Sequence, residues 1–219
     1  MTVETISENL FKKHCAERGV PCRRIPEDGR KVADFELTLG CGLAVAEIKQ
    51  LDPNECDLAF EALPHGTVGS GYAPVGRIRN LLSSAYLQIK PYAAAGQPGI
   101  VVCYNNAGGL NYIDNYTLTR AMFGGMAVYL GLNHDGVIHQ TGQGFTDNRK
   151  VTRNTCRGLS AVCVLSTPGR DSTKLVVYHN PYASHPLPPS ALRALADAQF
   201  DYDDPHGTNP QFLAHELEL

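Results

Sequence analysis

The spacing of apolar and polar residues along the chain predicts alternating helices and strands. Apolar residues recur at helical spacing over 5–18, with Ser7 as the expected cap and Gly19 as the end, and again over 74–89. The stretch 32–50 reads as two short apolar strands joined by Gly40-Cys41-Gly42. Further apolar runs predict strands at 20–25, 99–104, 126–130, 136–139, 159–165 and 174–179.

The remaining segments carry weaker patterns. Residues 115–123 and 188–199 are expected to be helical, and residues 141–154 to form a polar loop. Residues 52–73 contain several Gly and Pro residues without periodicity, so we expect a long irregular segment there. The order α-β-β-β-α-β followed by more strands predicts an α/β fold: one domain over 1–219 with a mixed central sheet flanked by helices.

Three charged side chains stand out in the hairpin at 32–50. Asp34 begins the first strand, and Glu47 and Lys49 lie near the end of the second. Because side chains alternate along a strand, Glu47 and Lys49 emerge on the same face. Two acids and a lysine grouped on apolar strands are the residue types that a metal-dependent phosphodiesterase requires.

The length of the hairpin loop decides whether the two acids meet. A two-residue turn places Asp34 opposite Glu47, with Cβ atoms about 4.5–5.5 Å apart. A three-residue loop instead pairs Phe35 with Glu47 and turns Asp34 to the other face, unless a bulge intervenes. The sequence leaves both registers open.

The arrangement Asp34…Glu47-Ile48-Lys49, with a helix before it and a long helix after it, resembles the PD-(D/E)xK nuclease superfamily over roughly residues 5–104. The resemblance implies a restriction-endonuclease-like αβββαβ core, with residues 105–219 as a C-terminal extension of the same domain that adds strands. It implies that Asp34 and Glu47 bind Mg²⁺ or Mn²⁺ and that Lys49 is the catalytic lysine.

The same resemblance extends to two further positions. Glu8 matches an acid that many members place on the first helix, and Gln88 with Tyr92 resembles the Gln-x-x-x-Tyr signature of a DNA-repair exonuclease branch. Two residues depart from the pattern. Ala33 stands where the name-giving proline would be. Pro91 lies between Gln88 and Tyr92 and lacks the backbone N–H of a helical hydrogen bond, which argues against these two side chains sharing one face of the helix.

The function implied by the resemblance is hydrolysis of DNA phosphodiester bonds, with a homodimer or a larger defence or repair complex as the assembly. The alternative is a nuclease-fold protein that binds nucleic acid or a protein partner without cleaving, as in phage defence. A purely structural alternative also stands: Asp34 and Lys49 form a salt bridge, Glu47 is an exposed strand residue and Glu8 a surface acid.

Charge is distributed unevenly along the chain. The net charge of −3 argues against strong non-specific nucleic-acid binding. Nevertheless, basic residues gather beside the candidate site, and we expect them either to contact phosphates or to form a solvated face: Lys12, Lys13, Arg23, Arg24, Arg30 and Lys31. The last 23 residues, 197–219, contain acids but neither Lys nor Arg.

Composition favours a soluble, cytoplasmic protein. Hydrophobic residues make up 43% of the 219 positions, and no apolar run is long enough to span a membrane. The N-terminus lacks the pattern of a signal peptide. Seven cysteines without a Cys-x-x-Cys pair are typical of buried thiols in a reducing compartment.

Overall fold

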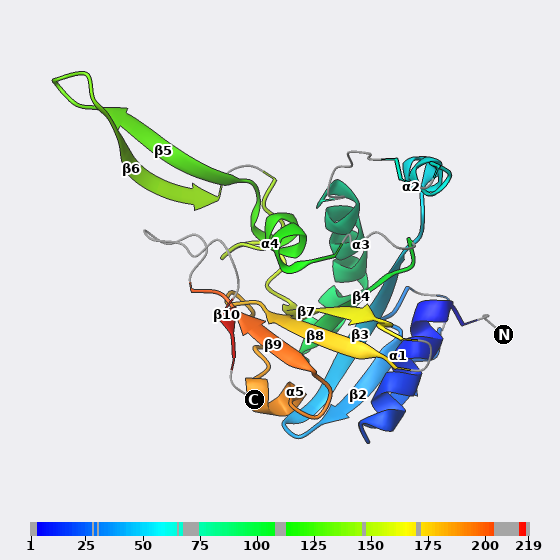
Figure 1. Ribbon diagram of the computed structural model, residues 1–219. Helices are drawn as coiled ribbons and strands as arrows, with labels where there is room; N and C mark the ends of the chain where they lie inside the picture. Colours follow the sequence, from blue (N-terminus) through cyan, green and yellow to red (C-terminus); the bar gives the residue numbers. More distant parts are fainter. Residues whose placement is uncertain are drawn as a thin grey trace.

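A computed structural model describes most of the chain (Figure 1). The described residues are 4–27, 29, 31–64, 66–67, 75–107, 113–145, 148–169, 172–203 and 215–217. The helices within them are α1 (Ile6–Glu17), α2 (Glu55–Glu61), α3 (Val75–Ala94), α4 (Asn115–Phe123) and α5 (Pro189–Leu192). The strands are β1 (Cys22–Arg24), β2 (Phe35–Leu39), β3 (Gly42–Leu51), β4 (Gly99–Asn105), β5 (Met126–Leu132), β6 (Ile138–Phe145), β7 (Leu159–Ser166), β8 (Lys174–His179), β9 (Ala198–Asp201) and β10 (His215–Glu216).

One mixed sheet organises the fold. Its strand order is β1-β2-β3-β4-β7-β8-β9-β10, and β3, β4 and β7 run parallel to one another at its centre. Helices flank the sheet, as Figure 1 shows. The predicted α/β class, with a mixed central sheet flanked by helices and with extra C-terminal strands, is confirmed. Of these strands, β7, β8, β9 and β10 extend the main sheet, whereas β5 and β6 form a separate two-stranded sheet.

The two faces of the sheet bury separate apolar clusters because side chains alternate along each strand. Phe35, Ala46 and Ile48 belong to the cluster that includes Phe11 of α1. Val45, between them in sequence, belongs to the cluster that includes Ile78, Leu82 and Ile89 of α3. Residues of β3 that share the face of Val45 therefore point towards α3.

The hairpin of β2 and β3 has the shorter of the two loops left open by the sequence. Leu39 pairs with Gly42 and Phe35 with Ala46, so Gly40 and Cys41 form a two-residue turn. The same register places Asp34, the residue before β2, opposite Glu47. The three-residue alternative is excluded.

Several predicted boundaries were wrong. Thr5, not Ser7, caps α1. Thr5 Oγ1 accepts a hydrogen bond from the backbone N–H of Glu8, and the Glu8 carboxylate accepts one from the backbone N–H of Thr5. The segment expected to be irregular contains α2, capped in the same way by Asn54 and Asp57. Part of it, 65 and 68–73, lies outside the described residues.

The C-terminal half differs in two places. The helix expected over 188–199 is only the short α5, and residues 198–201 form β9 beside β8. The loop expected from residue 141 begins later, because β6 continues to Phe145 and pairs with β5. Within the described residues, the structure contains no helix with the length and apolar character of a membrane span.

The contact between α3 and β4 generates a stability prediction. A Cβ atom on Gly99 would lie 2.2 Å from Cγ2 of Ile89, whereas a Cβ on Gly76, the second residue of α3, meets nothing within 4 Å. Gly99→Ala is therefore expected to lower the free energy of unfolding by about 1–3 kcal/mol. Gly76→Ala, the matched control, should raise it by about 0.5–1 kcal/mol because alanine favours the helix. Chemical denaturation measures both, and equal effects of the two changes would contradict this packing.

Candidate active site

Four elements bring the predicted site residues together. Asp34 precedes β2, Glu47 and Lys49 lie on β3, Gln88 on α3 and Glu8 on α1. Glu47 and Lys49 share the α3 face of the sheet with Val45. Figure 1 shows α1 beside the β2–β3 hairpin.

Glu47 is the centre of the group. The residue is 1% exposed, so the alternative of an exposed strand residue is wrong. Lys49 Nζ donates to Glu47 Oε1 over 2.6 Å, and Gln88 Nε2 donates to the same oxygen. The second oxygen, Oε2, is buried and accepts no hydrogen bond within the described part of the chain, whereas a protonated Glu47 can form a hydrogen bond with Asp34.

This environment disfavours the charged form of Glu47. Burial raises its pKa, and the negative charge of Asp34 raises it further, while Lys49 acts in the opposite direction. The result is a pKa of about 7, against an ordinary value of 4.5. A buried carboxylate with one oxygen unpartnered requires either a proton or a cation.

Asp34 is held in position by the backbone of the neighbouring strand. Its Oδ2 accepts from the N–H of Ile48 over 2.8 Å. Burial raises the pKa of Asp34, as does the negative charge of Glu8, whereas the hydrogen bond from Ile48 lowers it. The net shift is upward, so burial disfavours the anionic form of both acids of the hairpin; the charge of Glu8 adds to this effect at Asp34, and the charge of Asp34 adds to it at Glu47.

Gln88 and Tyr92 face the hairpin despite Pro91. The helix α3 continues through Pro91 to Ala94, and Pro91 lies in its last turns. Gln88 contacts Glu47, and the Tyr92 hydroxyl interacts with the backbone of Ala33. The two side chains therefore share the face of α3 that covers the site.

Glu8 lies near Asp34, but hydrogen bonds occupy both of its oxygens. Oε2 accepts from the Thr5 N–H over 2.6 Å and Oε1 accepts from Arg24 Nη1 over 2.7 Å. Burial acts to raise the pKa of Glu8, but these hydrogen bonds outweigh it and the net shift is downward. Glu8 therefore supplies a permanent negative charge beside Asp34 and anchors Arg24 there.

The ion pair of Arg24 with Glu8 was not anticipated. The sequence placed Arg24 among residues contacting phosphate, and no short-range pattern connects it to Glu8, because β1 and α1 meet only in the folded chain. Its guanidinium also lies 5.6 Å from the ring centroid of Phe35. Arg24 therefore fixes the end of α1 against the hairpin.

Most of the predicted phosphate-contacting residues are engaged with acids. Lys12 pairs with Glu4, Lys13 with Glu17 and Arg23 with Glu36. Lys31 is exposed, and Arg30 lies outside the described residues. Much of the positive charge of this segment is therefore already balanced within the chain.

Asp34 and Glu47 provide a pair of carboxylates, with Glu8 as a neighbour rather than a third ligand. Within the described residues, no group of three or more His, Cys, Asp and Glu side chains is arranged to hold a metal ion. A pair suffices for a hard cation that retains several waters, such as Mg²⁺. The unpartnered Oε2 of Glu47 is consistent with a cation there.

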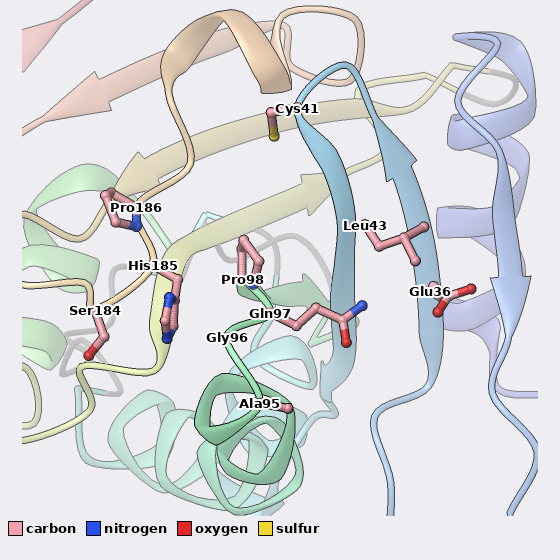
Figure 2. Close-up of a pocket in the computed structure, with 10 residues that line it drawn as sticks. All are labelled: Glu36, Cys41, Leu43, Ala95, Gly96, Gln97, Pro98, Ser184, His185 and Pro186. Atoms are coloured by element: carbon pink, nitrogen blue, oxygen red, sulfur yellow. The ribbon is translucent and has the colours of Figure 1, made fainter.

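The open groove of Figure 2 lies elsewhere on the hairpin. Its volume is about 650 Å³, and it lies at the starts of β3 and β4, with Leu43, Gln97 and His185 in its walls. Four residues of strand separate Leu43 from Glu47, which is about 13 Å. Neither Asp34 nor Glu47 lines the groove, although Glu36, two residues along the chain from Asp34, is part of its wall.

Comparisons of the chain with protein-family models, with curated proteins and with solved structures find no match.

The shifted pKa of Glu47 predicts how stability depends on pH. Below pH 4.5 the group is protonated in both folded and unfolded chains, and between 4.5 and about 7 only the folded chain holds the proton. The stability contributed by protonated Glu47 is therefore lost progressively as the pH rises from about 4.5 to about 7. Glutamine cannot lose this proton, so Glu47→Gln should remove the loss. The free energy of unfolding of the variant, relative to that of the wild type, should rise by about 3 kcal/mol between pH 4.5 and pH 8 without divalent ions.

Urea unfolding in the presence of a chelator, repeated across this pH range, measures the difference. Glu36→Gln is the matched control, because Glu36 lies on the adjacent strand with its side chain 26% exposed and paired with Arg23. Its difference from wild type should change much less with pH. An equal pH dependence for the two variants would contradict the environment described for Glu47.

Proposed function

We propose that the chain is a metal-dependent nuclease that hydrolyses DNA phosphodiester bonds. Asp34 and Glu47 hold Mg²⁺ or Mn²⁺ in this proposal, Lys49 acts on the water and the phosphate, and Gln88 and Glu8 position the acids. The observation that carries it is the buried Glu47 carboxylate with its unpartnered Oε2, opposite Asp34 and in contact with Lys49.

The order of elements supports the same proposal. Helix α1 is followed by the antiparallel strands β1, β2 and β3, then by α3 and by β4 parallel to β3. This is the αβββαβ order of the PD-(D/E)xK core that the sequence resembles, with α2 inserted and Ala33 in place of proline. The four strands lie side by side in the sheet.

Each residue has a defined task in the proposed reaction. A bound divalent cation supplies positive charge that stabilises the charge developing on the phosphate and makes water a better nucleophile. Lys49 Nζ, already within 2.6 Å of Glu47, donates hydrogen bonds to the attacking water or to a phosphate oxygen. Gln88 holds Glu47 Oε1 and leaves Oε2 for the cation.

Hydrolysis forms a bond from the water oxygen to phosphorus and breaks the bond from phosphorus to a deoxyribose oxygen. The water loses a proton and the leaving oxygen gains one. Ionised Glu47 is required in this scheme, and its pKa of about 7 makes the ionised form dominant only above neutral pH.

One observation favours the second candidate, a nuclease-fold protein that binds nucleic acid or a protein partner without cleaving, as in phage defence. Lys12, Lys13 and Arg23 are paired with carboxylates of the chain itself, which leaves less positive charge to hold a DNA substrate. The two candidates differ in whether phosphodiester bonds are broken.

Cleavage assays decide between them. The protein is incubated with plasmid, linear duplex and single-stranded DNA in Mg²⁺ or Mn²⁺, beside Asp34→Ala and Lys49→Ala. Each change should lower the cleavage rate by at least about 100-fold, because it removes a ligand or a charge that acts in the transition state. Lys90→Ala, at an exposed position on α3, is the control and should retain the wild-type rate.

Cleavage that persists in both variants would contradict this site. DNA binding without any cleavage would support the non-catalytic candidate.

Metal binding is expected to release a proton from Glu47. Calorimetric titration with Mn²⁺ in buffers of different ionisation enthalpy should show close to one proton released near pH 6 and close to none at pH 8.5, given the pKa of about 7. Glu47→Gln should abolish this release and weaken binding, whereas Glu36→Gln should leave both unchanged. Unaltered binding by Glu47→Gln would show that Mn²⁺ binds elsewhere.

A further inference from the structure

The ribbon formed by β5 and β6 stands apart from the main sheet. Within the described residues, these strands pair only with each other. Figure 1 shows the ribbon, in green, projecting away from the body beyond α4. It also concentrates exposed large apolar side chains: Val128 is 53% exposed, Leu130 65%, Leu132 71% and Ile138 62%.

These apolar side chains lie on one face of the ribbon. Val128, Leu130 and Leu132 alternate along β5 and therefore point the same way, and Ile138 pairs with Leu132. Two uncharged polar residues share this face, because Gln143 pairs with Val128 and Gln140 with Leu130, on either side of a register shift. The opposite face has a different character, because the Tyr129 ring lies over Gly142 and Gly144 there. Thr141 and His139 lie beside Gly131 on that second face.

The charge pattern excludes a nucleic-acid ligand for the apolar face. Between residues 121 and 145 the only Asp, Glu, Lys or Arg is Asp135, in the turn at the tip. Lys and Arg supply the electrostatic affinity of proteins for the phosphate backbone, and the two strands contain neither. An apolar surface of this kind is typical of a protein–protein contact.

We propose that the apolar face of the β5–β6 ribbon packs against the same face of a second copy of this chain, across a two-fold axis. In such an isologous contact the same surface of each copy packs against that of the other copy. An uncharged apolar face can do so without like-charge repulsion. The contact is independent of the proposed nuclease activity, since none of the site residues lies on the ribbon.

Charge at the two ends of the ribbon supports an antiparallel arrangement. Asp135 lies at the tip, while Arg120 in the last turn of α4 and Lys150 after β6 lie at the base. The backbone N–H of Lys150 donates to Met122, which fixes that residue beside the end of α4. Antiparallel packing brings Asp135 at the tip of each ribbon close to the Arg and Lys side chains at the base of the partner's ribbon.

The available area is sufficient for a modest dimer. Each of these side chains exposes on the order of 100 Å², so the paired faces, with Met126 at the base, bury on the order of 1,000 Å² in total. This is near the lower limit for a specific interface, so micromolar rather than nanomolar dissociation is expected.

Sedimentation equilibrium of the full chain tests the proposal. The wild type should form dimers with a dissociation constant in the micromolar range, and Leu130→Glu should weaken dimerisation at least tenfold by placing a carboxylate in the contact. Thr141→Glu, the matched control on the opposite face, should remain within about threefold of wild type. Circular dichroism verifies that both variants keep the fold.

Charge reversal tests the orientation. Asp135→Lys should weaken the dimer, and adding Lys150→Glu should restore it. A wild-type chain that stays monomeric at about 100 μM would overturn the proposal and leave the face for a different protein. Equal weakening by Leu130→Glu and Thr141→Glu would overturn the assignment of the face.

Discussion

The candidate site depends on one constraint, which is the burial of the Glu47 carboxylate beside Asp34. Two acids facing each other on adjacent strands repel, and burial weakens the solvent screening that would reduce this repulsion. The structure compensates only one oxygen of Glu47, through Lys49 and Gln88, and leaves the other unpartnered among the described residues. A site arranged in this way gains from any cation that supplies the missing contact.

The fold keeps this unfavourable pair in place through parts that have other roles. The two-residue turn at Gly40 and Cys41 fixes the register, and apolar alternation on β2 and β3 prevents a slip by one residue, which would exchange the buried and exposed faces. The capping box of α1 uses Glu8 and thereby sets its charge beside Asp34. The favourable free energy of helix formation and strand pairing therefore offsets the unfavourable free energy of holding the two acids together.

Sequence patterns predicted the elements whose periodicity is strong and local, such as α1, α3 and the central strands. They failed where tertiary contacts decide: residues 198–201 form a strand because β8 is beside them, although their composition suits a helix. At the site, Asp34, Glu47 and Lys49 were predicted to be neighbours, and they are. The pairing of Arg24 with Glu8 depends on how α1 meets β1, which no short-range pattern encodes.

The basic residues are a second case in which the sequence pattern does not reveal the tertiary contacts, and here the difference affects function. Counted along the chain, Lys12, Lys13 and Arg23 form a basic segment; in the folded chain each lies beside an acid. Attraction of DNA in the proposed reaction then falls mainly to a cation held by the two acids, because Lys49 is itself paired with Glu47. The site would thus bind phosphate strongly only when it is loaded with metal, which couples substrate affinity to the ionisation of Glu47.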